Sequence, residues 1–170
     1  LVRSRGLGDV YKRQPINCDF LHRESEFTET CTSIINNKVT ILTGASGIGK
    51  TRLALEVCRQ QDNGKTKVFC VKSNGNFLYE DIKYYISDSG KYLIFFDDVN
   101  MVVSLDNVLD TILTLPTDFD VKLLFSVRDY AKERVIDAVS RYVLPNIIEI
   151  GRFKDDEIKD ILKSDLEIVN

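Results

Sequence analysis

Residues 44–51 carry the spacing GxxxxGK[ST], a pattern that binds phosphate groups. They follow a short apolar run and open a segment of helical periodicity, which is the context that this chemistry requires. The glycines allow the backbone to aim successive N–H groups at phosphate oxygens, and the helix that follows adds its positive N-terminal end. We expect Lys50 to reach the β- and γ-phosphates of a nucleotide, and Thr51 to offer its hydroxyl to Mg²⁺. The alternative is a glycine-rich turn ahead of an ordinary helix.

Two carboxylates, Asp97 and Asp98, end a second apolar run, and the first of them lies 47 residues beyond Lys50. Ligands of open α/β sheets gather at the carboxyl ends of the strands, so both carboxylates are expected to face the bound phosphates. We expect Asp97 to hold Mg²⁺ and Asp98 to act as general base for the attacking water. The alternative is an acidic turn after a core strand.

A third apolar run ends at Arg128. A guanidinium at this position could touch the γ-phosphate, because its planar fork binds phosphate oxygens bidentately and loses the contact upon hydrolysis. The alternative is a surface arginine that pairs with the neighbouring Asp129.

The elements that must position these residues alternate between expected strands and expected helices along the sequence. Short β-branched and aromatic runs, apolar on both faces as in buried parallel strands, alternate with segments of helical periodicity, which predicts a doubly wound α/β sheet. Strands are expected at 39–43, 67–71, 92–96, 122–127 and 147–150, and helices at 50–59, 78–87, 105–113, 130–140 and 155–163. Ser104 is placed to cap the helix at 105–113, which Pro116 then ends.

The composition fits a folded, water-soluble domain. The chain has 170 residues, of which 44% are apolar and 29% charged, and this excludes disordered, fibrous and collagen-like classes. No apolar run approaches the roughly 18 residues that span a bilayer, so no membrane contact is expected. The four cysteines, Cys18, Cys31, Cys58 and Cys70, form no CxxC pattern, and we expect a reduced protein in the cytoplasm.

Residues 1–14, LVRSRGLGDVYKRQ, show no apolar periodicity and are interpreted as an artefactual or disordered tail. The tail holds four basic residues and one acidic residue, so the net charge of −3 becomes −6 without it. An acidic body without a Lys/Arg stripe argues against nucleic acid as a partner.

Taken together, the motifs resemble the STAND class of P-loop NTPases, which contains the NB-ARC and NACHT domains. YLIFFDDV at 92–99 is similar to the NB-ARC strand with paired aspartates, and LLFSVR at 123–128 to the family's strand that ends in Thr-Thr-Arg. FLHRESEF at 20–27 resembles the Gly-Arg-Glu box near the adenine, with His22 in place of the glycine. The stretch that begins at Ile148 resembles the strand leading into a small helical domain.

The resemblance implies a five-stranded parallel sheet in the order 5-1-4-3-2, flanked by helices. It implies an NTPase domain at 15–153, with 154–170 as the truncated start of a helical region and with effector and sensor domains outside this stretch. The nucleotide is expected to be ATP or ADP, because the nearest match to the guanine signature Asn-Lys-x-Asp, at 37–40, lacks the aspartate. The expected activity is slow hydrolysis of ATP, with the nucleotide state controlling conformation and self-association.

The expected site residues fall into three sets. The nucleotide-binding set is Gly44, Ala45, Ser46, Gly47, Ile48, Gly49, Lys50, Thr51, Arg52 and Arg23. The catalytic set is Lys50, Asp98 and Arg128, and the metal ligands are Thr51 and Asp97.

Two other functions remain open from the sequence. One is an AAA+ type ATPase that acts on nucleic acid or protein, for which Arg134 and Arg141 are candidate trans-acting arginines. The other is an interaction scaffold that binds ATP without hydrolysing it.

Overall fold

The computed structural model describes residues 2–3, 22–72 and 78–167. Within them, six strands form one sheet in the order β1-β3-β4-β5-β2-β6. The strands are β1 (Val2–Arg3), β2 (Val39–Gly44), β3 (Thr66–Lys72), β4 (Gly90–Asp97), β5 (Phe119–Arg128) and β6 (Asn146–Glu149). Strands β2 to β6 pair in parallel, and counting from β2 as the first strand gives the predicted order 5-1-4-3-2, which is thereby confirmed.

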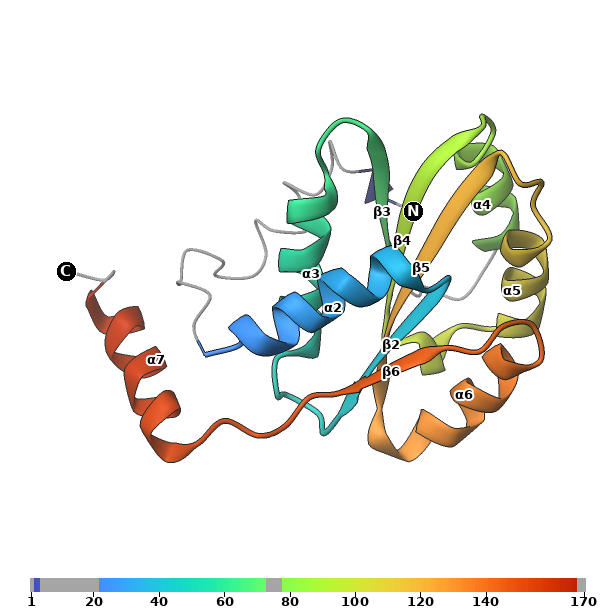
Figure 1. The fold of residues 1–170 in the computed structure, drawn as a ribbon. Helices are drawn as coiled ribbons and strands as arrows, with labels where there is room; N and C mark the ends of the chain where they lie inside the picture. Colours follow the sequence, from blue (N-terminus) through green and yellow to red (C-terminus); the bar gives the residue numbers. More distant parts are fainter. Residues whose placement is uncertain (1, 4–21, 73–77, 168–170) are drawn as a thin grey trace.

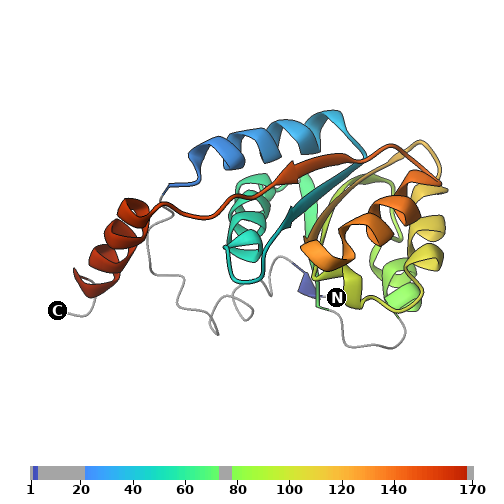
Figure 2. The same ribbon diagram turned by 90° about the horizontal axis from the view of Figure 1, so that it is seen from below.

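Helices cover both faces of the sheet (Figure 1). They are α2 (Glu24–Asn36), α3 (Lys50–Gln61), α4 (Leu78–Tyr85), α5 (Leu105–Leu113), α6 (Lys132–Ser140) and α7 (Asp155–Glu167), with 3-10 turns η2 (Val99–Met101) and η3 (Asp129–Ala131). α2 and α3 lie on one face, and α4, α5 and α6 lie on the other (Figure 2). α7 stands off from the sheet at the end of the linker 150–154 (Figures 1 and 2).

Alternation along the central strands builds two cores. In β4, Leu93 and Phe95 pack on the α3 side, whereas Ile94 and Phe96 pack against α4, α5 and α6. Because side chains two residues apart share a face, the residue at the end of β4 that follows Phe95 by two, Asp97, faces α3. The same alternation sets the face of the sheet on which each polar residue at the end of β5 lies.

Helix α2 was not expected. Its sequence is rich in Ser, Thr and Asn, which are poor helix formers, so the propensity signal is weak. The apolar residues Phe27, Cys31 and Ile34 nevertheless recur at helical spacing, and all three pack into the core on the α3 side.

Two further sequence expectations need correction. Ser104 occupies the N-cap position of α5, but its side chain makes no capping hydrogen bond, because its backbone is left-handed with φ 57°. Its carbonyl oxygen instead accepts bonds from the N–H groups of Asn107 and Val108. The tail was excluded from the fold, whereas Val2 and Arg3 pair antiparallel with β3 as strand β1. Residues 4–21, with the rest of the tail and Cys18, lie outside the described residues.

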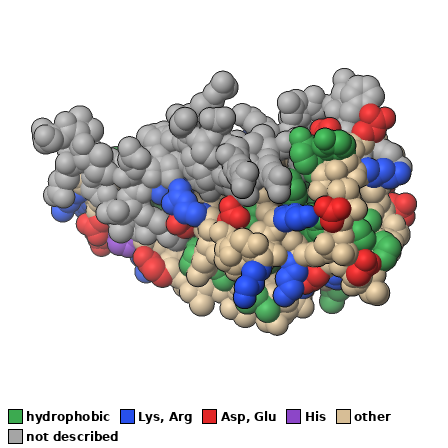
Figure 3. Space-filling view, turned by 90° about the horizontal axis from the view of Figure 1, so that it is seen from above, with side chains coloured by type: hydrophobic (Ala, Val, Ile, Leu, Met, Phe, Trp, Pro, Cys, Tyr) green, Lys and Arg blue, Asp and Glu red, His purple; other side chains and the backbone are tan. Residues whose placement is uncertain are grey.

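Charges of both signs are interspersed on the face seen in Figure 3. Among the described residues, no helix is long and apolar enough to cross a membrane.

Candidate functional site

The turn between β2 and α3 brings the backbone of residues 44–49 around the N-terminus of α3 (Figure 2). Gly49, the N-cap residue, has φ 96°, a left-handed conformation that residues with a side chain rarely adopt. Gly44 has φ 144°, and a Cβ atom there would lie 2.6 Å from the carbonyl oxygen of Ile150 and 2.6 Å from Cδ1 of Ile48. The first glycine is therefore required by packing as well as by conformation. Ser46 and Gly47, at the tip of the loop, are exposed.

Lys50 is the first residue of α3, and its side chain is buried, with 6% of its surface exposed. Its Nζ donates hydrogen bonds of 2.7 Å to the carbonyl oxygens of Gly44 and Ala45, so the ammonium lies inside the loop. Burial lowers the pKa of Lys50, and the nearby carboxylates, Asp129 foremost, oppose that shift. A buried cation in a cradle of backbone groups is suited to an anionic ligand.

Asp97 joins the loop helix to the neighbouring strands. Its Oδ1 accepts a 2.7 Å hydrogen bond from Oγ1 of Thr51 and a 2.8 Å bond from Oγ of Ser126. The two expected metal ligands, Thr51 and Asp97, are thus in direct contact. Sequence reasoning gave no role to Ser126, although a hydroxyl in an otherwise apolar strand was a usable signal.

Hydrogen bonds hold both the backbone and the side chain of Asp98. Its backbone is left-handed, with φ 48°, and its N–H donates a 2.8 Å hydrogen bond to Oγ of Ser126. Its two carboxylate oxygens accept bonds of 3.2 Å from Nε and 2.7 Å from Nη2 of Arg128. Arg128 therefore pairs with Asp98 and not with Asp129 as the alternative interpretation had it. These bonds raise the pKa of Arg128, which stays charged.

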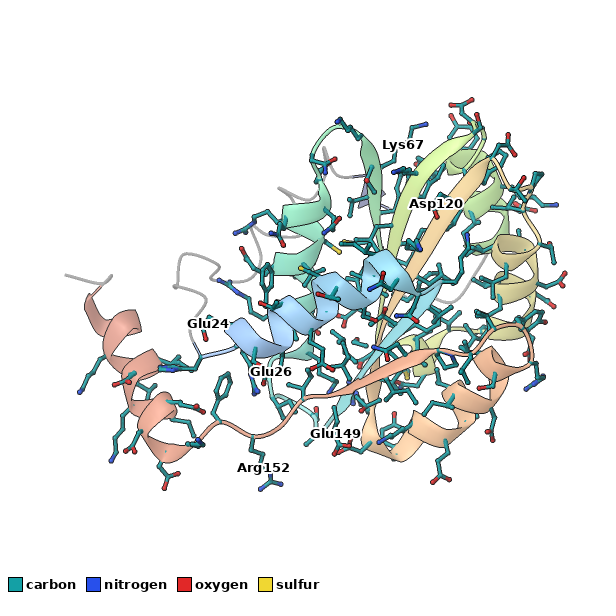
Figure 4. The ribbon with its side chains drawn as sticks, in the orientation of Figure 1. Glu24, Glu26, Lys67, Asp120, Glu149 and Arg152 are labelled. Carbon is teal, nitrogen blue, oxygen red and sulfur yellow. The ribbon has the colours of Figure 1, made fainter. Side chains whose placement is uncertain are left out.

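The two remaining residues of the expected set belong to different helices. Arg52 is in the first turn of α3 and is partly exposed. Arg23 is the N-cap residue of α2, and its guanidinium is buried against main-chain oxygens of the loop and of the linker. Figure 4 shows the start of α2, with Glu24 and Glu26, beside the linker that carries Arg152.

The arginines considered for action on a second subunit bind within their own chain. Arg134 donates a 2.9 Å hydrogen bond to the carbonyl oxygen of Asn100, and Arg141 forms a 3.0 Å ion pair with Asp106. Both contacts lie on the side of α5 and α6.

The family described as Novel STAND NTPase 3 matches residues 21–168, which include the loop, both carboxylates and the arginine. The chain belongs to this family. No curated protein matches it. The chain is thus a STAND-class P-loop NTPase domain, as the motifs indicated.

Solved structures share the fold of this STAND domain at low sequence identity. A closed state of Hsp104 with ATPγS and FITC casein has a TM-score of 0.70 at 18% identity, over 96% of this chain and 32% of that one. ORC1 of Aeropyrum pernix in complex with DNA has a TM-score of 0.67 at 17% identity, over 86% and 50%. RuvB of Thermotoga maritima, a Holliday junction branch migration motor, has 0.61 at 15%, over 86% and 51%. The STAND domain thus spans about half or less of these chains.

The donor set of the STAND domain fits Mg²⁺. Thr51 and Asp97 present hard oxygen atoms, and Mg²⁺ in nucleotide sites is bound through one or two such ligands together with phosphates and water. The hydroxyl of Thr51 donates its proton to Asp97, which leaves the lone pairs of its oxygen available.

Proposed function

We propose that this STAND domain binds ATP with Mg²⁺ and hydrolyses it slowly, and that the nucleotide state controls its conformation and self-association in the cytoplasm. The observation that carries the proposal is the convergence of four functional groups at the carboxyl ends of three adjacent strands. A buried ammonium, a carboxylate bonded to the loop threonine, a second carboxylate and a guanidinium meet there (residues 50, 97, 98 and 128). Family membership supports the same conclusion.

In this proposal, the loop binds the phosphates through its backbone N–H groups, and Lys50 neutralises the β- and γ-phosphates. Thr51 and Asp97 hold Mg²⁺, which would neutralise charge on the phosphates and orient them for in-line attack. Ser126 keeps the carboxylate of Asp97 in place through the hydrogen bond to Oδ1. Desolvation of Lys50 strengthens its attraction for phosphate, because charges interact more strongly where water is excluded.

Asp98 is the proposed general base, and Arg128 the proposed contact to the γ-phosphate. The two side chains are paired with each other, so Arg128 must exchange a carboxylate for a phosphate before Asp98 can accept a proton from water. This exchange adds a step before chemistry and favours a slow switch over a fast motor.

The same pairing favours a second candidate function, a module that binds ATP without hydrolysing it. Both oxygens of Asp98 accept bonds from Arg128, and a carboxylate that remains so engaged is a poor base. The two candidates predict the same binding and different turnover.

The test measures thermal unfolding with Mg²⁺ and either ATP or GTP, and then phosphate release. ATP at a hundredfold excess over its dissociation constant should stabilise the wild type by about 2.7 kcal/mol, and Lys50→Ala should abolish the shift. Asp98→Asn should keep the shift and lower kcat by about a hundredfold or more. Asp137→Asn, on the exposed side of α6, is the matched control and should leave both unchanged.

Three results would contradict parts of the proposal. The absence of a shift with either nucleotide, from folded protein, excludes a nucleotide switch. Binding without turnover in the wild type leaves the non-hydrolysing module. An equal sedimentation coefficient with ATP and with ADP excludes control of self-association by nucleotide.

A further inference from the structure

The buried guanidinium of Arg23 connects three segments that are far apart in the sequence. Its Nη2 donates hydrogen bonds of 2.7 Å to the carbonyl oxygen of Gly151 and 3.3 Å to that of Ile48. Its Nη1 bonds Glu26, and its Cζ lies 3.9 Å above the ring centre of Phe153. With 6% of its surface exposed, Arg23 is among the few buried charged residues described.

Helix α2 holds the backbone of Arg23 in a fixed position. Arg23 is the N-cap residue of α2, and its carbonyl oxygen accepts a 2.8 Å hydrogen bond from the N–H of Phe27. Ile34, near the other end of α2, is buried in the core on the α3 side. The backbone of Arg23 is therefore fixed to the sheet through a rigid helix.

The bond to Ile48 bears directly on the phosphate loop. The peptide between Ile48 and Gly49 is planar and trans, so its C=O and its N–H point in opposite directions. Because the C=O is held by Arg23, the N–H of Gly49 points away from Arg23. Gly49 has φ 96° and no side chain, and such a peptide rotates easily when nothing holds it. Arg23 thus fixes the direction of one N–H donor in the loop.

The hydrogen bond to Gly151 and the cation–π contact with Phe153 connect Arg23 to the linker. The linker leaves the sheet where the N–H of Ile150 donates a 2.8 Å hydrogen bond to the carbonyl oxygen of Thr43, and it leads to α7. Just before Arg23, Nε2 of His22 lies 3.6 Å from a carboxylate oxygen of Asp160 in α7. The two residues that precede α2 are consequently in contact with the loop, the linker and α7.

We propose that Arg23 is a positioning residue that ties the phosphate loop to the linker before α7, so that phosphate binding and ordering of the linker stabilise each other. The inference rests on the proposed nucleotide site and assigns Arg23 a role through Ile48 and Gly151, without contact to the base. A coupling of this kind is reciprocal, because whatever orders the linker also favours the loop geometry that binds phosphate.

The experiment compares Arg23→Ala with the wild-type chain in two measurements. Calorimetry gives the affinities for ATP and for inorganic tripolyphosphate, both with Mg²⁺, and hydrogen exchange follows the amides of 150–153 with and without tripolyphosphate. We expect Arg23→Ala to weaken both ligands by the same factor, about tenfold, and to remove the protection that tripolyphosphate gives to the linker. Arg59→Ala is the matched control, since Arg59 also pairs with a glutamate three residues away but lies outside the site.

Two further variants keep the test decisive if Arg23→Ala does not fold. Arg23→Lys retains the positive charge but lacks the planar guanidinium with its several donors. The affinities of this variant for ATP and tripolyphosphate should lie between those of the wild type and those expected for Arg23→Ala. Phe153→Leu removes the aromatic face and should reduce the linker protection while it leaves the Ile48 bond in place.

The proposal is overturned if ATP binding weakens while tripolyphosphate binding does not, because Arg23 would then contact the nucleoside. Unchanged affinities, or unchanged protection of 150–153, overturn it as well. A wild-type chain that binds neither ligand overturns the nucleotide site itself and the inference with it.

Discussion

At the scale of single residues, the hydroxyl of Ser126 joins the two carboxylates of the site. It donates to the side chain of Asp97 and accepts from the backbone N–H of Asp98, so both of its hydrogen-bonding functions are used. The side chain is 1% exposed, and water cannot replace it without rearrangement. A residue of this kind acts by holding other side chains in place.

Ser126→Ala should therefore weaken Mg²⁺-dependent nucleotide binding more than metal-free binding, and should lower the free energy of unfolding by about 1–3 kcal/mol, because the N–H of Asp98 is left unpaired. Ser126→Thr should restore both. Calorimetry with and without Mg²⁺, together with urea unfolding, measures the effects.

The control for Ser126→Ala is a second buried hydroxyl on the neighbouring strand. Oγ1 of Thr43 is buried and has no hydrogen-bond partner among the described residues. Thr43→Val should leave metal dependence unchanged. If it alters metal dependence as much as Ser126→Ala, the effect is one of packing and Ser126 has no special place in the site.

At the scale of elements, the loop between β2 and α3 depends on close packing with the linker. The Cα of Gly44 leaves no room for a side chain beside Ile150 and Ile48. The loop is therefore in direct contact with Ile150, the first residue of the linker.

Gly44→Ala should lower the free energy of unfolding by about 1–3 kcal/mol more than the control Gly90→Ala. The two glycines have almost the same backbone angle, φ 144° and 145°, but a Cβ at Gly90 would meet no atom within 4 Å. The difference between the variants in urea unfolding isolates the contact with the linker. Equal losses of unfolding free energy in the two variants would show that backbone strain alone causes the destabilisation.

The sequence predicted the elements around the loop well because their signals are local. The five parallel strands, the helix 105–113 and the loop follow from runs, periodicity and a spaced motif. Helix α2 was missed because Ser and Thr weaken its propensity, and tertiary packing of Ile34 stabilises it instead. The strand order came from the family resemblance and not from spacing.

The contacts within the site could not be predicted from the sequence, because they join residues that are far apart in the chain. Arg128 and Asp98 are 30 residues apart, and Arg23 and Gly151 are 128 apart. Nearest neighbours in sequence suggested Asp129 as the partner of Arg128, and only the parallel pairing of β4 and β5 brings Asp98 closer.

At the scale of the whole molecule, a layered body carries one helix that does not belong to its layers. α7 lies away from the sheet, and its apolar residues Ile158 and Leu162 are 42% and 56% exposed. The described body, by contrast, buries apolar residues on both faces of the sheet. The domain boundary expected near residue 153 stays a prediction, and truncation of the chain at that point tests it.

A chain that ends at Lys154 should consequently unfold within about 4 °C of the full chain, which corresponds to roughly 1 kcal/mol for a protein of this size. A chain that ends at Ser140 lacks β6 and should not fold. Circular dichroism on heating measures both. A larger loss upon removal of α7 would make the helix an integral part of the domain and would move the boundary.

The left-handed backbone of Asp98 also restricts which residues can occupy this position. Glycine, asparagine and aspartate adopt such a conformation readily, whereas glutamate and the β-branched residues do not. A longer acid is thus disfavoured here by the main chain, whatever the chemistry would gain from it. Asp98→Asn needs a single base change and keeps the turn intact, so the substitution that removes the proposed base without straining the main chain is also a short mutational step.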